Sequence, residues 1–285
     1  MGVYSGEMKK PGLVGEKHDC KATLDDQQVM DFCRNGYLKL EGVVPDKINT
    51  RVVDFLDTHD SAEPSEILAE DWFVDGVIKN PQAAGAVRSL LGKNFALPLL
   101  ISNHRVHCPA PTINWHQDGG SIITARLDYL QVFYYPESVS REMGPTEILP
   151  GSHLQRGYGG FLSRLRSLKG SVLTVSAAGT IFLTAYSIWH RRSASTGTGI
   201  RNNLKYNYWR TVPPCRDWNT DPAFNFSWLD NKVPPFTVRA AELLAWLCAE
   251  EWQHLGGQSW PCFSHTVLDS DQPGLPQGLR RDGQT

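Results

Sequence analysis

The sequence predicts a mostly β protein with flanking helices around a double-sheet jelly-roll core. From about residue 97 the chain becomes a series of short strand-like segments, separated by turn signals such as Asp118-Gly119-Gly120 and Pro150-Gly151. No long helical pattern is interleaved with them, and about eight short strands at this spacing are typical of a jelly roll. We expect strands near residues 99–108, 114–116, 127–135, 145–149, 171–175, 180–184, 187–190 and 201–210.

Helical patterns flank this β-rich region. Thr23 followed by Asp26 has the form of a capping box, and Asn35-Gly36 is a helix-ending signal. The periodicity of apolar residues, together with Gly and Pro at the ends of each segment, predicts the other helices and strands. The expected elements are a helix ending at 35–36, a strand over 37–40, a helix from 46 to about 56, a helix over 81–91 and a helix over 240–252.

Length and composition favour one globular domain with an ample core. The chain has 285 residues, of which 41% are apolar and 20% charged. We predict a flexible N-terminal segment over residues 1–21 and a single domain over 22–255, with the jelly-roll core at about 97–210. The last residues, 256–285, are rich in Pro, Gly and Gln and are expected to form an irregular tail.

Charge and hydropathy exclude several classes of partner. The net charge is −2 and no run of like charges occurs, so we expect neither a nucleic acid nor a membrane as partner. The N-terminal stretch has no apolar signal-peptide region, so a cytoplasmic location is expected. Six cysteines without a CxxC pair argue against a thiolate zinc site. A small-molecule substrate remains, with a monomer or a homodimer both possible.

Two distant segments supply a candidate metal site. His116 and Asp118 lie in a Trp-His-Gln-Asp stretch, and two residues that are two apart on a strand share a face. His190 follows 74 residues later in an Ile-Trp-His stretch. Two imidazoles and one carboxylate make a facial triad, which leaves three positions open on a non-haem Fe(II).

A carboxylate clamp accompanies this triad. Arg201 lies eleven residues after His190, and its planar guanidinium can hold a carboxylate by two parallel hydrogen bonds. An open metal beside such a clamp is suited to the oxidative decarboxylation of a 2-oxo acid. The sequence therefore predicts a dioxygenase that uses non-haem Fe(II), a 2-oxo acid and O₂.

These features resemble the phytanoyl-CoA dioxygenase family of Fe(II)- and 2-oxoglutarate-dependent oxygenases. The resemblance rests on DDQQVMDFCRNGYLKLEGVV near the N-terminus, the WHQD stretch, GPTEILPGSH at 144–153, and His190 with Arg201, and it covers residues 24–210. It implies a double-stranded β-helix with iron held by His116, Asp118 and His190. It also implies that Arg201 grips the distal carboxylate of 2-oxoglutarate.

Further residues are weaker candidates. Thr146, in the Gly-Pro-Thr segment, and Asn103, on the strand before the metal-binding stretch, are candidate cosubstrate ligands, although each could be purely structural. Four aromatic residues are candidates for an apolar substrate pocket: Trp115, Tyr135, Trp189 and Tyr206. His153 in the Pro-Gly-Ser-His turn is expected to hydrogen-bond locally and not to bind metal.

Three alternatives to a small-molecule oxygenase stay open. The same family contains acyl-CoA hydroxylases, but no basic cluster suited to the phosphates of coenzyme A is evident in the sequence. We therefore favour a free small molecule, a specialised metabolite, as the substrate. Hydroxylation is the expected reaction, with desaturation or rearrangement as alternatives. A non-catalytic jelly roll with a vestigial metal site is a second alternative. A zinc hydrolase is the third, and it would need a general base such as Glu147 beside the metal.

Overall fold

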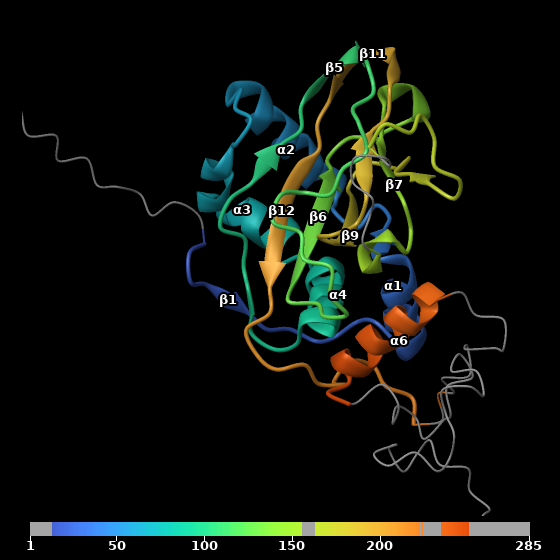
Figure 1. Cartoon of the computed structure of the whole chain (residues 1–285). Helices are drawn as coiled ribbons and strands as arrows, with labels where there is room; N and C mark the ends of the chain where they lie inside the picture. Colours follow the sequence, from blue (N-terminus) through green and yellow to red (C-terminus); the bar gives the residue numbers. More distant parts are fainter. Residues whose placement is uncertain (1–12, 156–162, 223, 225–234, 251–285) are drawn as a thin grey trace, which may run out of the picture.

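The computed structural model describes residues 13–155, 163–222, 224 and 235–250 (Figure 1). The helices are α1 (Asp26–Asn35), α2 (Asp46–Thr58), α3 (Asp71–Phe73), α4 (Pro81–Leu91) and α6 (Pro235–Leu247), with short 3-10 or π turns η1 (Ser65–Ala69), η2 (Val74–Ile78), η3 (Arg141–Met143) and η4 (Ser152–Leu154). The strands are β1 (Lys17–His18), β2 (Tyr37–Leu40), β3 (Phe95–Ala96), β4 (Ser102–Asn103), β5 (Val106–Ala110), β6 (Tyr129–Tyr135), β7 (Thr146–Ile148), β8 (Val172–Leu173), β9 (Thr180–Ala185), β10 (His190–Arg192), β11 (Ser195–Arg201) and β12 (Leu204–Trp209).

The strands form one large and two small antiparallel sheets. The large sheet has the order β1-β3-β12-β6-β9-β2, with β4 also paired to β12. A three-stranded sheet has the order β10-β7-β8, and β11 pairs with β5. Figure 1 shows β12, β6 and β9 side by side through the centre of the molecule, with β5 and β11 extending together beyond one end. This is the mostly β jelly-roll architecture that the sequence predicts.

The central strands alternate between two different environments. On β6, Leu130, Val132 and Tyr134 belong to the main hydrophobic cluster, which also contains residues of α1, α4 and α6. The residues between them face the small sheet, and Phe133 and Tyr135 pack there in a second cluster with Ile148 of β7. Because neighbouring strand residues point to opposite faces, polar residues of β6 and β12 can reach the space between the sheets.

Helix α1 begins at a capping box two positions after the predicted one. The Oδ1 atom of Asp25 accepts from the backbone N–H of Gln28 at 2.8 Å, and the Gln28 side chain accepts from the backbone N–H of Asp25 at 3.1 Å. The predicted pair of Thr23 and Asp26 is therefore wrong. Asp26 is buried instead and accepts from the indole N–H of Trp218 at 2.8 Å.

Local signals predicted several element boundaries correctly. The strand over 37–40 and the helix over 81–91 are found at those bounds, and Gly36 ends α1 with a left-handed φ of 76°. Helix α2 extends to 58, and α6 covers 235–247 instead of 240–252. The strand expected at 187–190 begins only at 190, and 195–201 forms a strand that was not expected.

The structure describes only part of the predicted N-terminal segment and none of the predicted C-terminal tail. Most of the N-terminal segment 1–21 and all of the tail 256–285 lie outside the described residues. The domain boundaries at 22 and 255 therefore stay predictions. Within the described part of the chain, no helix is long and apolar enough to cross a membrane.

Candidate metal centre

A short antiparallel bridge brings the two predicted histidines together. The backbone N–H of His116 donates to the carbonyl of His190 at 3.0 Å, and the N–H of His190 donates back at 2.9 Å. Residues opposite each other in such a pair project to the same side. The two imidazole rings consequently lie with their centroids 4.4 Å apart, although the residues are 74 positions apart in the chain.

Backbone carbonyls fix which nitrogen of each ring is available. The Nδ1 atom of His116 lies 3.0 Å from the carbonyl of Asn114, and Nδ1 of His190 lies 3.0 Å from the carbonyl of Ile188. A carbonyl oxygen only accepts, so each Nδ1 carries the hydrogen and each Nε2 keeps its lone pair. Both lone pairs are then free to bind a metal, and the ring orientation is set in advance.

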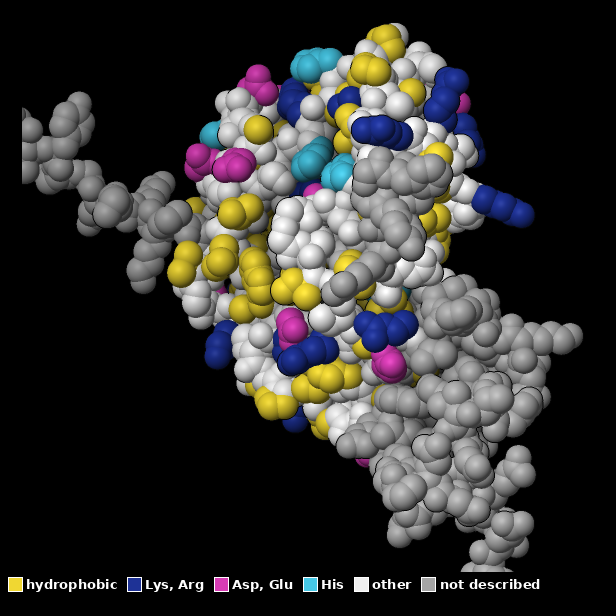
Figure 2. Space-filling view, in the orientation of Figure 1, with side chains coloured by type: hydrophobic (Ala, Val, Ile, Leu, Met, Phe, Trp, Pro, Cys, Tyr) yellow, Lys and Arg dark blue, Asp and Glu magenta, His cyan; other side chains and the backbone are white. Residues whose placement is uncertain are grey.

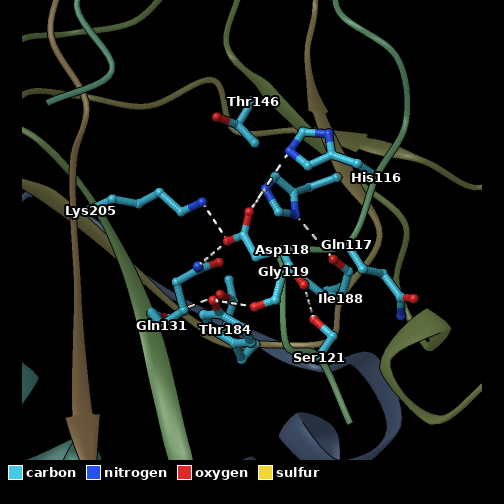
Figure 3. Close-up of polar contacts among 12 residues, drawn as sticks. His116, Gln117, Asp118, Gly119, Ser121, Gln131, Thr146, Thr184, Ile188 and Lys205 are labelled. Atoms are coloured by element: carbon cyan, nitrogen blue, oxygen red, sulfur yellow. Dashed lines mark hydrogen bonds and ion pairs between the residues drawn. The ribbon is translucent and has the colours of Figure 1, made fainter. Parts of the chain in front are cut away.

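Asp118 completes the cluster with one specific oxygen. Its Oδ1 lies 3.6 Å from Nε2 of His190 and 3.9 Å from Nε2 of His116. Its Oδ2 accepts from the Lys205 ammonium at 2.5 Å and from the Gln131 side-chain amide. Figure 3 shows this division, with one carboxylate oxygen turned toward Lys205 and Gln131 and the other toward His116. These contacts orient the carboxylate so that a single oxygen, Oδ1, faces the two histidines.

The charge states of these groups suit metal binding near neutral pH. Burial disfavours ionisation of Asp118, but the Lys205 charge and the hydrogen bonds outweigh burial and lower the pKa of Asp118 to about 2. Burial, with the charge of Lys205, lowers the pKa of His190 to about 3. A carboxylate and a neutral imidazole are the forms that bind a metal ion.

The three candidate ligand atoms lie within 4.8 Å of one another, and they are the only such group of three or more His, Cys, Asp or Glu residues in the described part of the chain. Two neutral nitrogens and one carboxylate oxygen without any thiolate are a donor set that fits Fe(II). The residues therefore fit the metal that the sequence predicts. Their role as ligands stays a prediction.

The two histidines of the triad line a cavity that also contains Arg201. This cavity measures about 390 Å³, and its wall includes His116, His190 and Arg201. Figure 2 shows histidine and basic side chains gathered on this face of the molecule. The guanidinium of Arg201 donates to the carbonyls of Gly144 at 2.9 Å and His104 at 3.3 Å, while its Nε has no partner. Arg201 is 3% exposed and has no carboxylate partner among the described residues.

Thr146 and Asn103 also line this cavity. The Thr146 hydroxyl accepts from the Tyr135 hydroxyl at 2.9 Å, so Tyr135 supports the threonine from behind. Asn103 donates to the Asn202 side chain at 3.0 Å and accepts from the Asn203 backbone at 3.3 Å. Thr146 is therefore held at the cavity wall, whereas both ends of the Asn103 amide already have protein partners.

The four predicted pocket aromatics do not line this cavity. Trp115 and Trp189 immediately precede the two histidines and so point to the opposite side of the chain, where both are buried. Tyr206 belongs to the hydrophobic cluster on the helix side of the large sheet and also borders a smaller pocket with Asp118. Tyr135 lies behind Thr146. The prediction that some of these four line an apolar substrate pocket is therefore not supported by this cavity, and it stays a prediction.

Several basic residues at the site were missed from the sequence. Besides the predicted Arg201, the cavity wall contains four further basic residues: Arg105, Arg191, Arg192 and Lys205. Together with Arg201 they come from three strands and one connecting segment, so they form no cluster in the linear sequence. No linear cluster therefore indicated this basic lining, and the expectation that no cluster suited to the phosphates of coenzyme A lies near the pocket stays a prediction. One signal for Lys205 was available, because a charged residue inside the aromatic strand LKYNYW needs a buried partner.

His153 has a structural position, but not the local one expected from the sequence. It is 2% exposed, and its Nε2 donates to the carbonyl of Cys33 at 3.2 Å, which lies 120 residues earlier. Its ring also packs against Gly36 at the end of α1. His153 thus joins η4 to the end of α1 and lies apart from the triad.

Comparison with solved structures establishes the fold. HygX from Streptomyces hygroscopicus with nickel and 2-oxoglutarate bound is 17% identical, with 72% of this chain and 93% of that chain covered and a TM-score of 0.54. The non-haem α-ketoglutarate-dependent carbocyclase SnoK from nogalamycin biosynthesis is 14% identical, with coverage of 68% and 87% and a TM-score of 0.52. The epimerase SnoN from the same biosynthesis is 15% identical, with coverage of 65% and 82% and a TM-score of 0.52.

These neighbours share the jelly-roll fold of non-haem, 2-oxoglutarate-dependent enzymes, and this chain has that fold. No family model matches the sequence, and no curated protein matches it either. The resemblance to the phytanoyl-CoA dioxygenase family therefore stays a prediction.

Proposed function

We propose that this protein is an Fe(II)- and 2-oxoglutarate-dependent dioxygenase that oxidises a small molecule and releases succinate and CO₂. His116, Asp118 and His190 would hold the iron, and Arg201 would bind the distal carboxylate of 2-oxoglutarate. Iron with this cosubstrate and O₂ supplies the oxidising power for an unactivated C–H bond, and the protein supplies position and exclusion of side reactions.

The observation that carries this proposal is the buried charge of Arg201 in the same cavity as the triad. A guanidinium that is 3% exposed and bonded only to neutral carbonyls leaves its charge uncompensated. Such a buried charge is costly unless an anion neutralises it. A carboxylate held by Arg201 at one end, with its other end at the metal, would neutralise it.

The remaining residues act by positioning. Lys205 and Gln131 hold one oxygen of Asp118, which leaves the other for the metal. Tyr135 fixes the Thr146 hydroxyl at the cavity wall, where it can donate to a cosubstrate carboxylate. Asn103 would support the wall through its bonds to Asn202 and Asn203 rather than bind the cosubstrate.

A specialised metabolite is the substrate class we favour. Support comes from the neighbours, since one HygX structure contains hygromycin B and SnoN has been crystallised with a nogalamycin compound. Hydroxylation is the default outcome, with desaturation or rearrangement as alternatives. An acyl-CoA substrate remains the runner-up within the same chemistry.

The zinc-hydrolase alternative is disfavoured by the position of Glu147. Its carboxylate accepts from Arg191 at 2.7 Å and from the Ser171 hydroxyl at 2.6 Å. Both oxygens are thus engaged by other side chains, and Glu147 does not line the cavity of the triad. A general base beside a metal-bound water would need a free carboxylate oxygen there.

Anaerobic titration with Fe(II) and 2-oxoglutarate tests the proposal. Bidentate chelation gives a weak visible charge-transfer band, so we expect this band in the wild type. Arg201→Ala should raise the Kd for 2-oxoglutarate at least about tenfold, because a charge-assisted bond contributes about 1.5–3 kcal/mol, while iron affinity stays near that of the wild type. His116→Ala should abolish both iron retention and activity. Absence of the band in the wild type with both components present would defeat the proposal.

A further inference from the structure

The basic residues of the cavity wall divide into paired and unpaired cations. Three of them have a close carboxylate partner: Arg105 with Asp57 at 2.8 Å, Arg191 with Glu147 at 2.7 Å, and Lys205 with Asp118 at 2.5 Å. Among the described residues, the other two, Arg192 and Arg201, have no carboxylate within ion-pair distance. The cavity therefore carries more positive charge than its own carboxylates neutralise.

Arg192 is aimed into the cavity by the geometry of β10. It lies two residues after His190, so the two side chains share a face of the strand. Across the sheet it is paired with Thr146, which also lines the cavity. Its guanidinium donates to the carbonyl of Pro111 at 2.8 Å, and its buried Nε has no partner. Among the described residues, no other acceptor of the protein competes with a bound anion for this guanidinium.

Arg192 and Arg201 lie at different depths. Arg201 is 3% exposed, whereas Arg192 is half-buried next to Pro111 and close to Ile113, which lines the same cavity and is 39% exposed. On the proposed function, one carboxylate of 2-oxoglutarate lies at the metal and the other at Arg201. The charge of Arg192 also acts on Arg201, so one carboxylate serves two interacting guanidinium groups, and Arg192, the more exposed of the two, keeps a charge without its own counter-charge.

We propose that Arg192 forms an anion subsite for the substrate, so that the substrate carries a carboxylate or phosphate group. This inference rests on the proposed function and narrows its substrate class. A planar guanidinium holds either group by two parallel hydrogen bonds, and Arg cannot lose its charge near neutral pH. Glu63, the one Asp or Glu residue that lines the described cavity wall, is exposed and forms no ion pair with Arg192.

The experiment compares charged and neutral probes of similar shape. Protein loaded with Ni(II) and saturating 2-oxoglutarate is titrated by calorimetry with benzoate, phenyl phosphate, coenzyme A and the neutral benzamide. The variants are Arg192→Gln, Arg192→Lys, and Arg105→Gln as the matched control, since Arg105 lines the same cavity but has its own carboxylate. The Kd for 2-oxoglutarate is measured for each variant.

We expect the wild type to bind benzoate or phenyl phosphate at least about tenfold more tightly than benzamide, because charged hydrogen bonds are worth that much. Arg192→Gln should remove this preference, Arg192→Lys should retain part of it, and Arg105→Gln should keep it. The Kd for 2-oxoglutarate should stay within about twofold in all three variants. Coenzyme A binding much more tightly than phenyl phosphate, again through Arg192, would identify a coenzyme A ester as the source of the anion.

Three results would overturn the inference. The first is equal binding of benzoate, phenyl phosphate and benzamide by the wild type. The second is an equal loss of the preference for anionic probes in Arg105→Gln. That result would show that the overall positive charge of the cavity, and not a subsite at Arg192, attracts the anions. The third is a tenfold weaker 2-oxoglutarate affinity in Arg192→Gln, which would assign Arg192 to the cosubstrate. Failure of the proposed function is detected by a different measurement, namely the absence of the charge-transfer band when the wild type is titrated with Fe(II) and 2-oxoglutarate.

Discussion

Lys205→Met is expected to destabilise the metal-free protein and yet to tighten its metal binding. The Lys205 and Asp118 side chains are 10% and 18% exposed, and their charged atoms are 2.5 Å apart. Breaking a buried ion pair by removing one partner costs about 3–5 kcal/mol. Because Gln131 still donates to the same carboxylate oxygen, we expect a loss near the lower end of that range, about 3 kcal/mol.

A divalent ion bound at the other oxygen of Asp118 would restore the missing counter-charge. It would also no longer be repelled by the Lys205 ammonium. The loss of stability should therefore shrink in the metal-loaded variant, and a thermodynamic cycle turns that difference into affinity. A recovery of about 1.4 kcal/mol corresponds to tenfold tighter metal binding.

The assay is urea unfolding of wild type and variant, with and without Ni(II), together with the Kd for Ni(II). Arg191→Met is the matched control, because the Arg191–Glu147 pair is also buried, with its charged atoms 2.7 Å apart, but in the described structure it forms no ion pair with Asp118. It should be destabilised by a similar amount in both metal states. If Lys205→Met lost the same stability with and without Ni(II), or bound Ni(II) more weakly, the assigned role of Lys205 would be refuted.

Two further predictions concern the packing of η4 against α1. Burial lowers the pKa of His153 to about 4, so the folded protein binds fewer protons than the unfolded chain between pH 6.5 and 4. Stability should therefore fall as the pH is lowered through this window, and His153→Gln should flatten the slope by up to about 1.4 kcal/mol per pH unit in urea titrations; identical slopes would contradict this. Gly36→Ala combines a left-handed φ of 76° with a Cβ that would lie 2.3 Å from Nδ1 of His153, so we expect a loss of about 2–5 kcal/mol in urea unfolding. Gly15→Ala, at a φ of 77° with nothing within 4 Å, should lose only about 1 kcal/mol, and an equal loss at both positions would refute the contact with His153.

Local signals account for the parts of the fold that were predicted well. The segment 37–40 alternates, and Pro81 and Gly92 bound α4 on both sides, so those elements could be placed from a few neighbouring residues. The strand over 195–201 was missed because its sequence, STGTGIR, is rich in Gly, Ser and Thr and has no apolar alternation. It is specified by pairing with β5, across a register shift between Ser195 and Gly199, which no local pattern encodes.

The candidate site shows the same division between local and distant information. The spacing of His116 and Asp118 could be derived from the sequence, but their union with His190 depends on a backbone bridge between distant segments. The misplaced aromatics, in contrast, were open to correction from the sequence itself. If His116 and His190 face the metal, then Trp115 and Trp189, as their immediate neighbours on extended backbone, must face away.

The same rule can be applied to Lys205. Leu204, Tyr206 and Tyr208 of β12 belong to the helix-side cluster, so Lys205 between them must point into the space between the sheets. An ammonium there needs an anion, and a carboxylate that binds metal through one oxygen has a second oxygen to offer. Alternation and charge balance together thus predict the contact of Lys205 with Asp118. What they do not give is the register of β12 against β6, which pairs Lys205 with Phe133 and so determines how far along the strand the ammonium lies.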